Sequence, residues 1–285
     1  MRAVRRAQGA ANALLEPAQR ASWSGSKYMY VALVSFRNKT AYILDVLGAS
    51  VFYALILFIF VQLWTVLIGS GKLRVEGFGV REMVWYMVVS EGIMIGRARI
   101  ESETDEEVKN GSIAYALNKP YHYVWFKFAA YWGETGLKLL LNTAIGSVVA
   151  LLLVGPVAVQ GLNLAGVILL IGLGLVLDFF IKMSICMLAF WVEDTLPFFW
   201  IYGKLLFIFG GLFAPIEIYS ARLAGIARAT PFNHVIYGPA RLFIRFEIGL
   251  FWRVLAGQAV WIVVAASIAF GLYGLGVKRL NVNGG

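Results

Sequence analysis

The chain of 285 residues is 60% hydrophobic and only 14% charged, whereas an ordinary soluble domain has about 25% charged residues. That leaves too few polar side chains to cover the surface of a soluble protein of this length. Three long stretches, residues 46–71, 139–177 and 254–277, contain no charged residue at all. Apolar runs of about 18 residues or more are typical of transmembrane helices. The composition therefore excludes a soluble fold and predicts an all-α integral membrane protein.

The net charge of +9 is concentrated near the ends of the chain and in one later segment. Residues 1–40 contain seven Lys and Arg residues and a single acid, Glu16, and the C-terminal tail begins with Lys278 and Arg279. Such an excess of cations keeps a segment in the cytoplasm. No sequence motif that reads nucleic acid accompanies the charge, so we expect no nucleic-acid partner. We predict a plasma-membrane protein with both termini in the cytoplasm.

The predicted elements begin with a basic tail over residues 1–21. Residues 22–41 mix aromatic, aliphatic and cationic side chains, which is typical of a helix lying in the membrane interface. A transmembrane domain over 42–280 follows, and 281–285 form a tail. We predict six membrane spans within this domain, at about residues 43–68, 82–97, 132–154, 163–190, 196–217 and 251–276.

Two connections between these spans have unusual compositions. Residues 97–120 are too polar for lipid, and we place them in the cytoplasm. Residues 218–250 fall outside the cell in a six-span topology, although the stretch from Glu217 to Arg253 has five arginines, at 222, 228, 241, 245 and 253, against the usual positive-inside bias. The apolar stretch IYGPARLFI within this external segment favours short helices that turn back toward the membrane.

Charged residues inside the spans are candidates for function because charges are costly in lipid. Glu134 with Lys138, and Asp178 with Lys182, are each spaced so that acid and base meet on one helix face. Asp178 and Lys182 are expected near the middle of the fourth span, where either a structural ion pair or a role in the pathway fits. We name Glu91, Asp178 and Lys182 as candidate translocation-pathway residues.

Enzyme chemistry is not visible in the sequence. The two histidines, His122 and His234, have no carboxylates at metal-ligand spacing, and Cys186 is the single cysteine. No complete phosphate-binding loop and no nucleophile elbow occur. We therefore predict neither enzymatic activity nor a metal or other cofactor in this chain.

Residues 101–120 form an acidic and then apolar segment. Five acids occur between Glu101 and Glu107, where a helix N-terminus favours anions and Ser102 or Thr104 is a possible cap. Gly111 interrupts the pattern and Pro120 ends it. The pattern predicts a short helical element outside the bilayer. A helix that simply faces water remains the alternative interpretation.

Two motifs in this order carry a resemblance to a known family. They read Glu107-Val108-x-x-Gly111-x-Ile113-Ala114-x-x-Leu117-x-x-Pro120 after the second span, and Thr230-Pro231-Phe232-x-x-x-Ile236-Tyr237-x-Pro239-Ala240 before the last. With the interfacial helix and the order of spans, residues of about 25–280 resemble the ABC-2 type permeases. The similarity is to the branch with six spans and a separate ATPase subunit.

The resemblance implies a cytoplasmic coupling helix, at about residues 104–117, that rests in a groove of the ATPase. It also implies an interfacial helix before the first span and short external helices between spans five and six. The residues expected to contact the ATPase are Asp105, Glu106, Glu107, Val108, Gly111, Ile113 and Leu117.

The implied assembly contains a second permease subunit, identical or related, and two ATPase subunits that bind ATP and Mg²⁺. Export is the implied direction of transport. A stand-alone ion-coupled carrier or channel, using Glu91, Asp178 and Lys182, is the main alternative. A membrane enzyme acting on lipids and a scaffold without transport activity also remain open.

Overall fold

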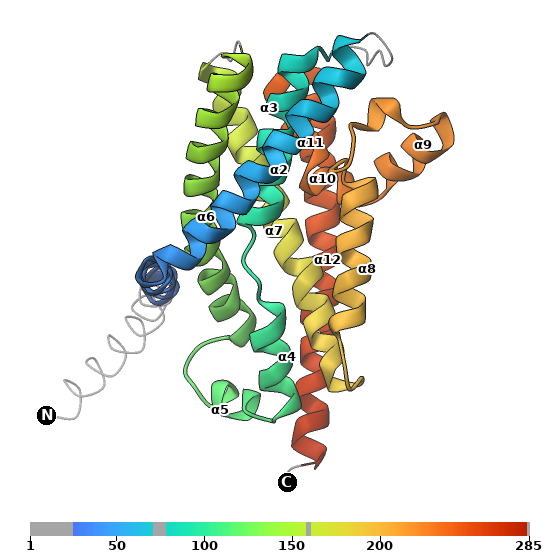
Figure 1. Cartoon of the computed structure of the whole chain (residues 1–285). Helices are drawn as coiled ribbons and strands as arrows, with labels where there is room; N and C mark the ends of the chain where they lie inside the picture. Colours follow the sequence, from blue (N-terminus) through green and yellow to red (C-terminus); the bar gives the residue numbers. More distant parts are fainter. Residues whose placement is uncertain (1–24, 71–77, 158–160, 284–285) are drawn as a thin grey trace, which may run out of the picture.

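A computed structural model describes residues 25–70, 78–157 and 161–283 (Figure 1). The predicted basic tail, the first residues of the interfacial helix and the last two residues of the chain lie outside this described part. Within it, the chain is helical and contains no strand. The all-α fold expected from the composition is therefore confirmed.

The helices follow one another with short connections. Residues 25–41 are helical and precede α2 (Ile43–Gly69), α3 (Val80–Gly96), α4 (Glu101–Lys109), α5 (Ile113–Leu117), α6 (Tyr123–Val154), α7 (Gly161–Met187), α8 (Leu196–Phe209), α9 (Ala221–Ala229), α10 (Phe232–Val235), α11 (Tyr237–Ile244) and α12 (Ile248–Asn283). Single turns of 3₁₀-helix, Leu188–Phe190 and Ile216–Ile218, follow α7 and precede α9.

Four of these helices are long and apolar enough to cross a membrane. The candidate spans are Ser50–Gly69, Tyr123–Val154, Asn163–Phe190 and Ile248–Arg279. The other two helices at predicted span positions are shorter: α3 has 17 residues and includes three charged side chains, and α8 has 14. The fifth predicted span was expected to reach residue 217, but α8 ends at Phe209 because Gly211 takes a φ of +72° and turns the chain.

The long helices stand side by side, with the short helices gathered at the two ends (Figure 1). α7 packs along α12, and α3 packs between α2 and α6. α11 contacts both α3 and α7 and so joins these two groups. α4 and α5 lie at the opposite end of the bundle from α9 and α11 (Figure 1).

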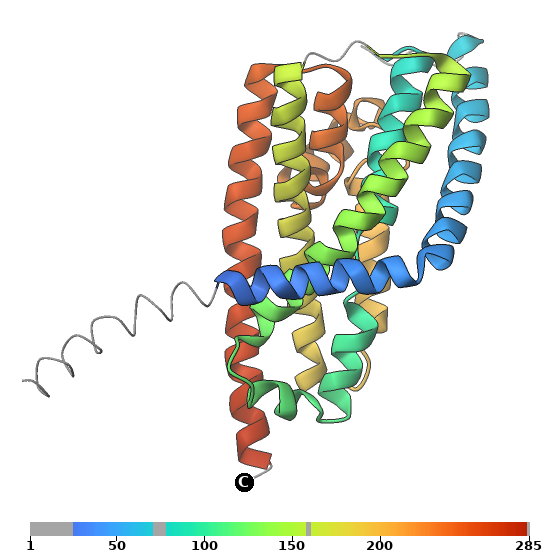
Figure 2. The same cartoon turned by 90° about the vertical axis from the view of Figure 1, so that its left-hand side faces the viewer.

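The helix of residues 25–41 crosses the bundle nearly at right angles to α6 and α12 (Figure 2). It approaches α6 closely at Gly133, where a Cβ atom would collide with the carbonyl oxygen of Ala32. An ion pair between Lys39 and Glu134, with 3.1 Å from Nζ to Oε1, holds the crossing. The first ten residues of α6, 123–132, therefore extend beyond the crossing helix on the side of α4 and α5 (Figure 2).

The segment between α8 and α12 folds back onto the bundle through one buried arginine. Arg241 on α11 is 8% exposed. Its guanidinium donates to Glu217 at 3.0 Å and to Glu247 at 3.2 Å, and lies 5.3 Å from the centre of the Phe78 ring. A buried arginine needs such partners. Arg241 therefore stabilises the packing of this arginine-rich segment on the bundle and is not a signal for its membrane topology.

Candidate functional site

A buried ion cluster, consisting of Arg97, Tyr131, Asp178, Lys182 and Tyr202, joins four helices. Asp178 on α7 is fully buried and accepts hydrogen bonds from the hydroxyls of Tyr131 at 2.9 Å and Tyr202 at 2.6 Å. Its carboxylate also pairs with Arg97, directly after α3, and with Lys182, 3.4 Å from Nζ to Oδ2. The ion pair expected from the spacing of Asp178 and Lys182 is therefore present, but it is one part of a larger network.

Both carboxylate oxygens of Asp178 are hydrogen-bonded or ion-paired to other side chains of the chain. Removing charged groups from water is costly unless they are paired and hydrogen-bonded, and here one anion serves two cations and two hydroxyls. Lys182 also donates to the carbonyl of Ala98 at 2.9 Å. These contacts hold α3, α6, α7 and α8 together, which favours the structural interpretation of the Asp178 and Lys182 pair.

The cluster lies close to the level at which the crossing helix meets the bundle. Tyr131, which contacts Asp178, is only two residues before Gly133, where residues 25–41 cross α6. Asp178 is near the middle of α7 by count. The part of α7 that follows it, like the start of α6, extends toward α4.

Glu91 lies in a different environment from the cluster. It is 5% exposed, and none of the hydrogen bonds or ion pairs among the described residues involves its carboxylate. It lines a cavity of about 740 Å³ between α2, α3, α6, α7 and α8. Arg97, Lys182 and Tyr202 line the same cavity, whereas Asp178 does not. The structure thus brings two of the three predicted pathway residues to one cavity.

The cytoplasmic segment forms two short helices, separated at Gly111. This glycine has a φ of +74°, which accounts for the interruption expected there. The predicted caps are wrong: α4 begins at Glu101 with Ile100 at the cap position, so Ser102 and Thr104 lie inside the helix.

The acids of α4 attach it to neighbouring elements. Asp105 accepts a hydrogen bond from Thr195 at 2.7 Å and pairs with Lys109 at 2.5 Å. The hydrogen bond from Lys109 to Asp105 raises the pKa of the Lys109 amino group. Glu107 accepts from the Tyr123 hydroxyl and from Lys127, the latter at 3.0 Å. α4 is therefore bonded to the start of α6 and to the loop before α8.

Most of the residues expected to contact an ATPase face the interior of the chain. Asp105, Val108 and Ile113 are buried, and Glu107 is occupied by the partners just described. Glu106 is exposed, and Gly111 and Leu117 are partly exposed. Their role in contacting a partner stays a prediction, and the outward surface available for it is centred on Glu106.

Tyr115 on α5 is a surface residue that the sequence analysis missed. Its side chain is 76% exposed, although it lies in an apolar run. The signal was present in the sequence: on a helix, Tyr115 points away from the face that carries the buried Ile113. Tyr115 and Glu106 thus both point outward from the α4 and α5 segment.

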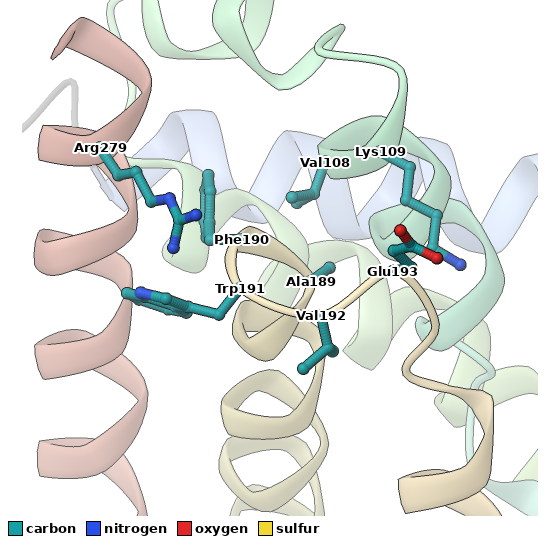
Figure 3. A pocket seen from close by; sticks show the side chains of 8 residues that line it. All are labelled: Val108, Lys109, Ala189, Phe190, Trp191, Val192, Glu193 and Arg279. Atoms are coloured by element: carbon teal, nitrogen blue, oxygen red, sulfur yellow. The ribbon is translucent and has the colours of Figure 1, made fainter. Parts of the chain in front are cut away.

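A second cavity, of about 530 Å³, lies beside α4 at the same end of the molecule (Figure 3). Arg279 on α12 and Trp191, just after α7, both extend into the space between their helices (Figure 3). Val108 and Lys109 of α4 and Glu193 line it on the other side. These residues are far apart in the chain, so the sequence alone did not associate them with α4.

No group of three or more His, Cys, Asp and Glu side chains suited to a metal ion occurs in the part of the chain that the structure describes. Cys186 is buried in the core formed by α7 and its neighbours.

Comparison with known proteins identifies the family. Residues 49–284 match the family described as ABC-2 family transporter protein, which covers the bundle from α2 to the end of α12. None of the curated proteins compared with the chain matches it. The helical bundle, its apolar spans and this match together show that the chain belongs to the ABC-2 transporter family, the membrane subunits of ABC transporters that associate with an ATPase.

Proposed function

We propose that this chain is an exporter permease that works with a second permease subunit, identical or related, and with two separate ATPase subunits that bind ATP and Mg²⁺. In this proposal α3 and α8 cross the membrane with the four longer helices, which gives six spans. The N- and C-termini then lie in the cytoplasm of a cell whose plasma membrane contains the transporter.

The crossing helix supports this placement in the membrane. If residues 25–41 lie in the cytoplasmic interface, the part of α6 from residue 133 to 154 lies on the membrane side. These 22 residues span about 33 Å at 1.5 Å per residue, close to the hydrocarbon thickness of about 30 Å. The earlier part of α6, together with α4 and α5, then projects into the cytoplasm.

The observation that carries the proposal is the way α4 is attached at this projecting end. Its outward side presents Glu106, while its inner side is bonded to Lys127 of α6 and to Thr195, next to α8. A partner that displaces α4 therefore pulls on α6 and on the start of α8 through direct contacts. This is the connection that ATP-driven movement requires.

The cavity beside α4 extends the surface available to the ATPase. It adds Trp191 and Val192 as apolar groups, with Arg279 and Glu193 as charges of opposite sign. Aromatic and arginine side chains are enriched at interfaces where a few residues dominate the binding energy. We assign this cavity and the exposed side of α4 and α5 to one ATPase-binding surface.

Co-purification tests this assignment. The full chain with Glu106→Lys and Tyr115→Ala, both exposed, should insert in the membrane but lose most of the ATP-binding-cassette ATPase expressed with it. The control, Arg222→Glu with Ile226→Ala, also reverses one charge and truncates one exposed apolar side chain, but on α9 at the opposite end. Equal ATPase recovery with the two variants would refute the binding surface.

A transport assay separates the proposal from the stand-alone carrier. Purified chain reconstituted alone in liposomes should show no transport, and addition of the ATPase with ATP and Mg²⁺ should start it. Transport driven by an ion gradient without ATPase or nucleotide would contradict the proposal and support the carrier.

A further inference from the structure

Two carboxylates that line the 740 Å³ cavity, Glu91 and Glu101, have no ion pair with the described residues, and Glu91 is the more deeply buried of the two. Glu91 is 5% exposed and lines this cavity. None of the hydrogen bonds and ion pairs found among the described residues involves its side chain. An unpaired buried charge is costly, so buried carboxylates are ordinarily paired.

Four of the five cations in the lining of the same cavity have carboxylate partners. Lys39 and Lys138 both contact Glu134, at 3.1 and 2.5 Å, and Arg97 and Lys182 both contact Asp178. The remaining two charges in the lining, the exposed Arg99 and the half-buried Glu101, are of opposite sign. Glu91 is therefore the buried carboxylate of this lining that lacks an ion pair among the described residues, beside the half-buried Glu101, whose Oε2 atom also has no hydrogen-bond partner.

Glu91 is also separated from these cations along the cavity. It precedes Arg97 by six residues on α3, which is about 9 Å of helix, in the direction away from α4. At this level α3 packs against α2: a Cβ atom added at the adjacent Gly92 would lie 3.6 Å from the Tyr53 hydroxyl oxygen. The cavity thus has a charged end near α4 and an end with a single carboxylate.

Apolar and aromatic side chains complete the lining. Phe52 and Ile56 come from α2, Met94 and Ile95 from α3, and Phe199 from α8. The volume of about 740 Å³ falls in the range of about 300–1,000 Å³ typical of small-molecule sites, which are mostly apolar with a few polar groups. Aromatic rings also attract organic cations.

We propose that this cavity binds an amphipathic organic cation, with its positive charge beside Glu91 and its apolar body against Phe52, Ile56 and Phe199. The proposal rests on the transport function above and names the class of substrate. A bare metal cation does not fit the site, because hard cations need about six oxygen ligands.

Two probes of the same shape and opposite charge test the proposal. Tetraphenylphosphonium and tetraphenylborate are measured by equilibrium dialysis against the purified full chain in detergent micelles. The wild-type chain should bind tetraphenylphosphonium saturably and more tightly than tetraphenylborate. Glu91→Gln, which keeps the size of the side chain, should weaken tetraphenylphosphonium binding at least tenfold. Glu193→Gln, in the cavity beside α4, should leave it unchanged.

Two results would overturn the cation site. One is tetraphenylborate binding that equals or exceeds tetraphenylphosphonium binding in the wild-type chain, a comparison that does not depend on any variant folding. The other is equal tetraphenylphosphonium affinity of the wild type and a folded Glu91→Gln chain. ATPase co-purification should be unaffected by Glu91→Gln. A chain that binds the cation but recovers no ATPase would refute the proposed function and leave the site intact.

Discussion

Replacing Asp178 by asparagine tests whether the buried ion cluster stabilises the bundle. The substitution keeps the size of the side chain but leaves Arg97 and Lys182, 8% and 5% exposed, without their carboxylate. Removing one partner of a buried ion pair costs about 3–5 kcal/mol. Arg97 and Lys182 also line the cavity, where water can reach them, so we expect the lower end, about 3 kcal/mol.

The single cysteine of the chain provides the assay. Cys186 is fully buried on α7, in the core next to the cluster, so a thiol-reactive fluorogenic dye labels it only after unfolding. One kcal/mol shifts the unfolding midpoint by about 2–4 °C in a domain of about 200 residues. Asp178→Asn should therefore lower the midpoint in detergent micelles by about 6–12 °C.

The exposed Glu106, which has no ion pair among the described residues, supplies the control. Glu106→Gln should shift the midpoint by less than about 2 °C, since surface substitutions change stability by about 0.5 kcal/mol or less. A midpoint of Asp178→Asn that matches this control would refute the stabilising role of the cluster. The double variant Arg97→Met, Asp178→Asn should lose less than the sum of its single variants, because each removes a partner of the other.

Three further predictions follow from the packing. Gly133→Ala should displace the crossing helix and lower the unfolding midpoint, because its methyl group would collide with backbone, whereas Gly136→Ala, with nothing within 4 Å, should not. Arg241→Met should destabilise the fold by about 1–3 kcal/mol, because the partners of Arg241 lose their hydrogen bonds. Arg245→Met should destabilise it much less, since the Arg245 side chain is 64% exposed. Both variants are measured with the same dye. A cysteine at Arg228 should react with a membrane-impermeant maleimide added outside intact cells carrying a Cys186→Ala chain; labelling only after the membrane is opened would contradict the six-span topology.

The sequence by itself determined the class of fold and the approximate positions of the long helices. Long uncharged stretches can be stable only as helices in lipid, because every backbone hydrogen bond must be made within the segment. Helices are present at all six predicted positions, and four of them meet the length and apolarity of a span. The number of spans beyond these four depends on how α3 and α8 sit in the membrane, which composition does not fix.

The ends of helices were harder to predict than their existence. α6 begins at Tyr123, about two and a half helical turns before the expected span, because its first residues pack against α4 and the crossing helix instead of lipid. α8 stops at Phe209 because of the turn at Gly211. Both boundaries depend on contacts or backbone conformations that an apolar pattern does not record.

Only the tertiary structure decided which charged residues are paired within the chain and which face outward, where a partner can contact them. The spacing of Asp178 and Lys182 indicated a pair on one helix, but Arg97, 81 residues away in the chain, is a further partner of Asp178. Acids of similar appearance in the sequence also proved different: Glu107 is bonded to α6, whereas Glu106 faces outward. The physical reason is that pairing requires atoms within a few ångströms, and the packing of distant helices sets those distances.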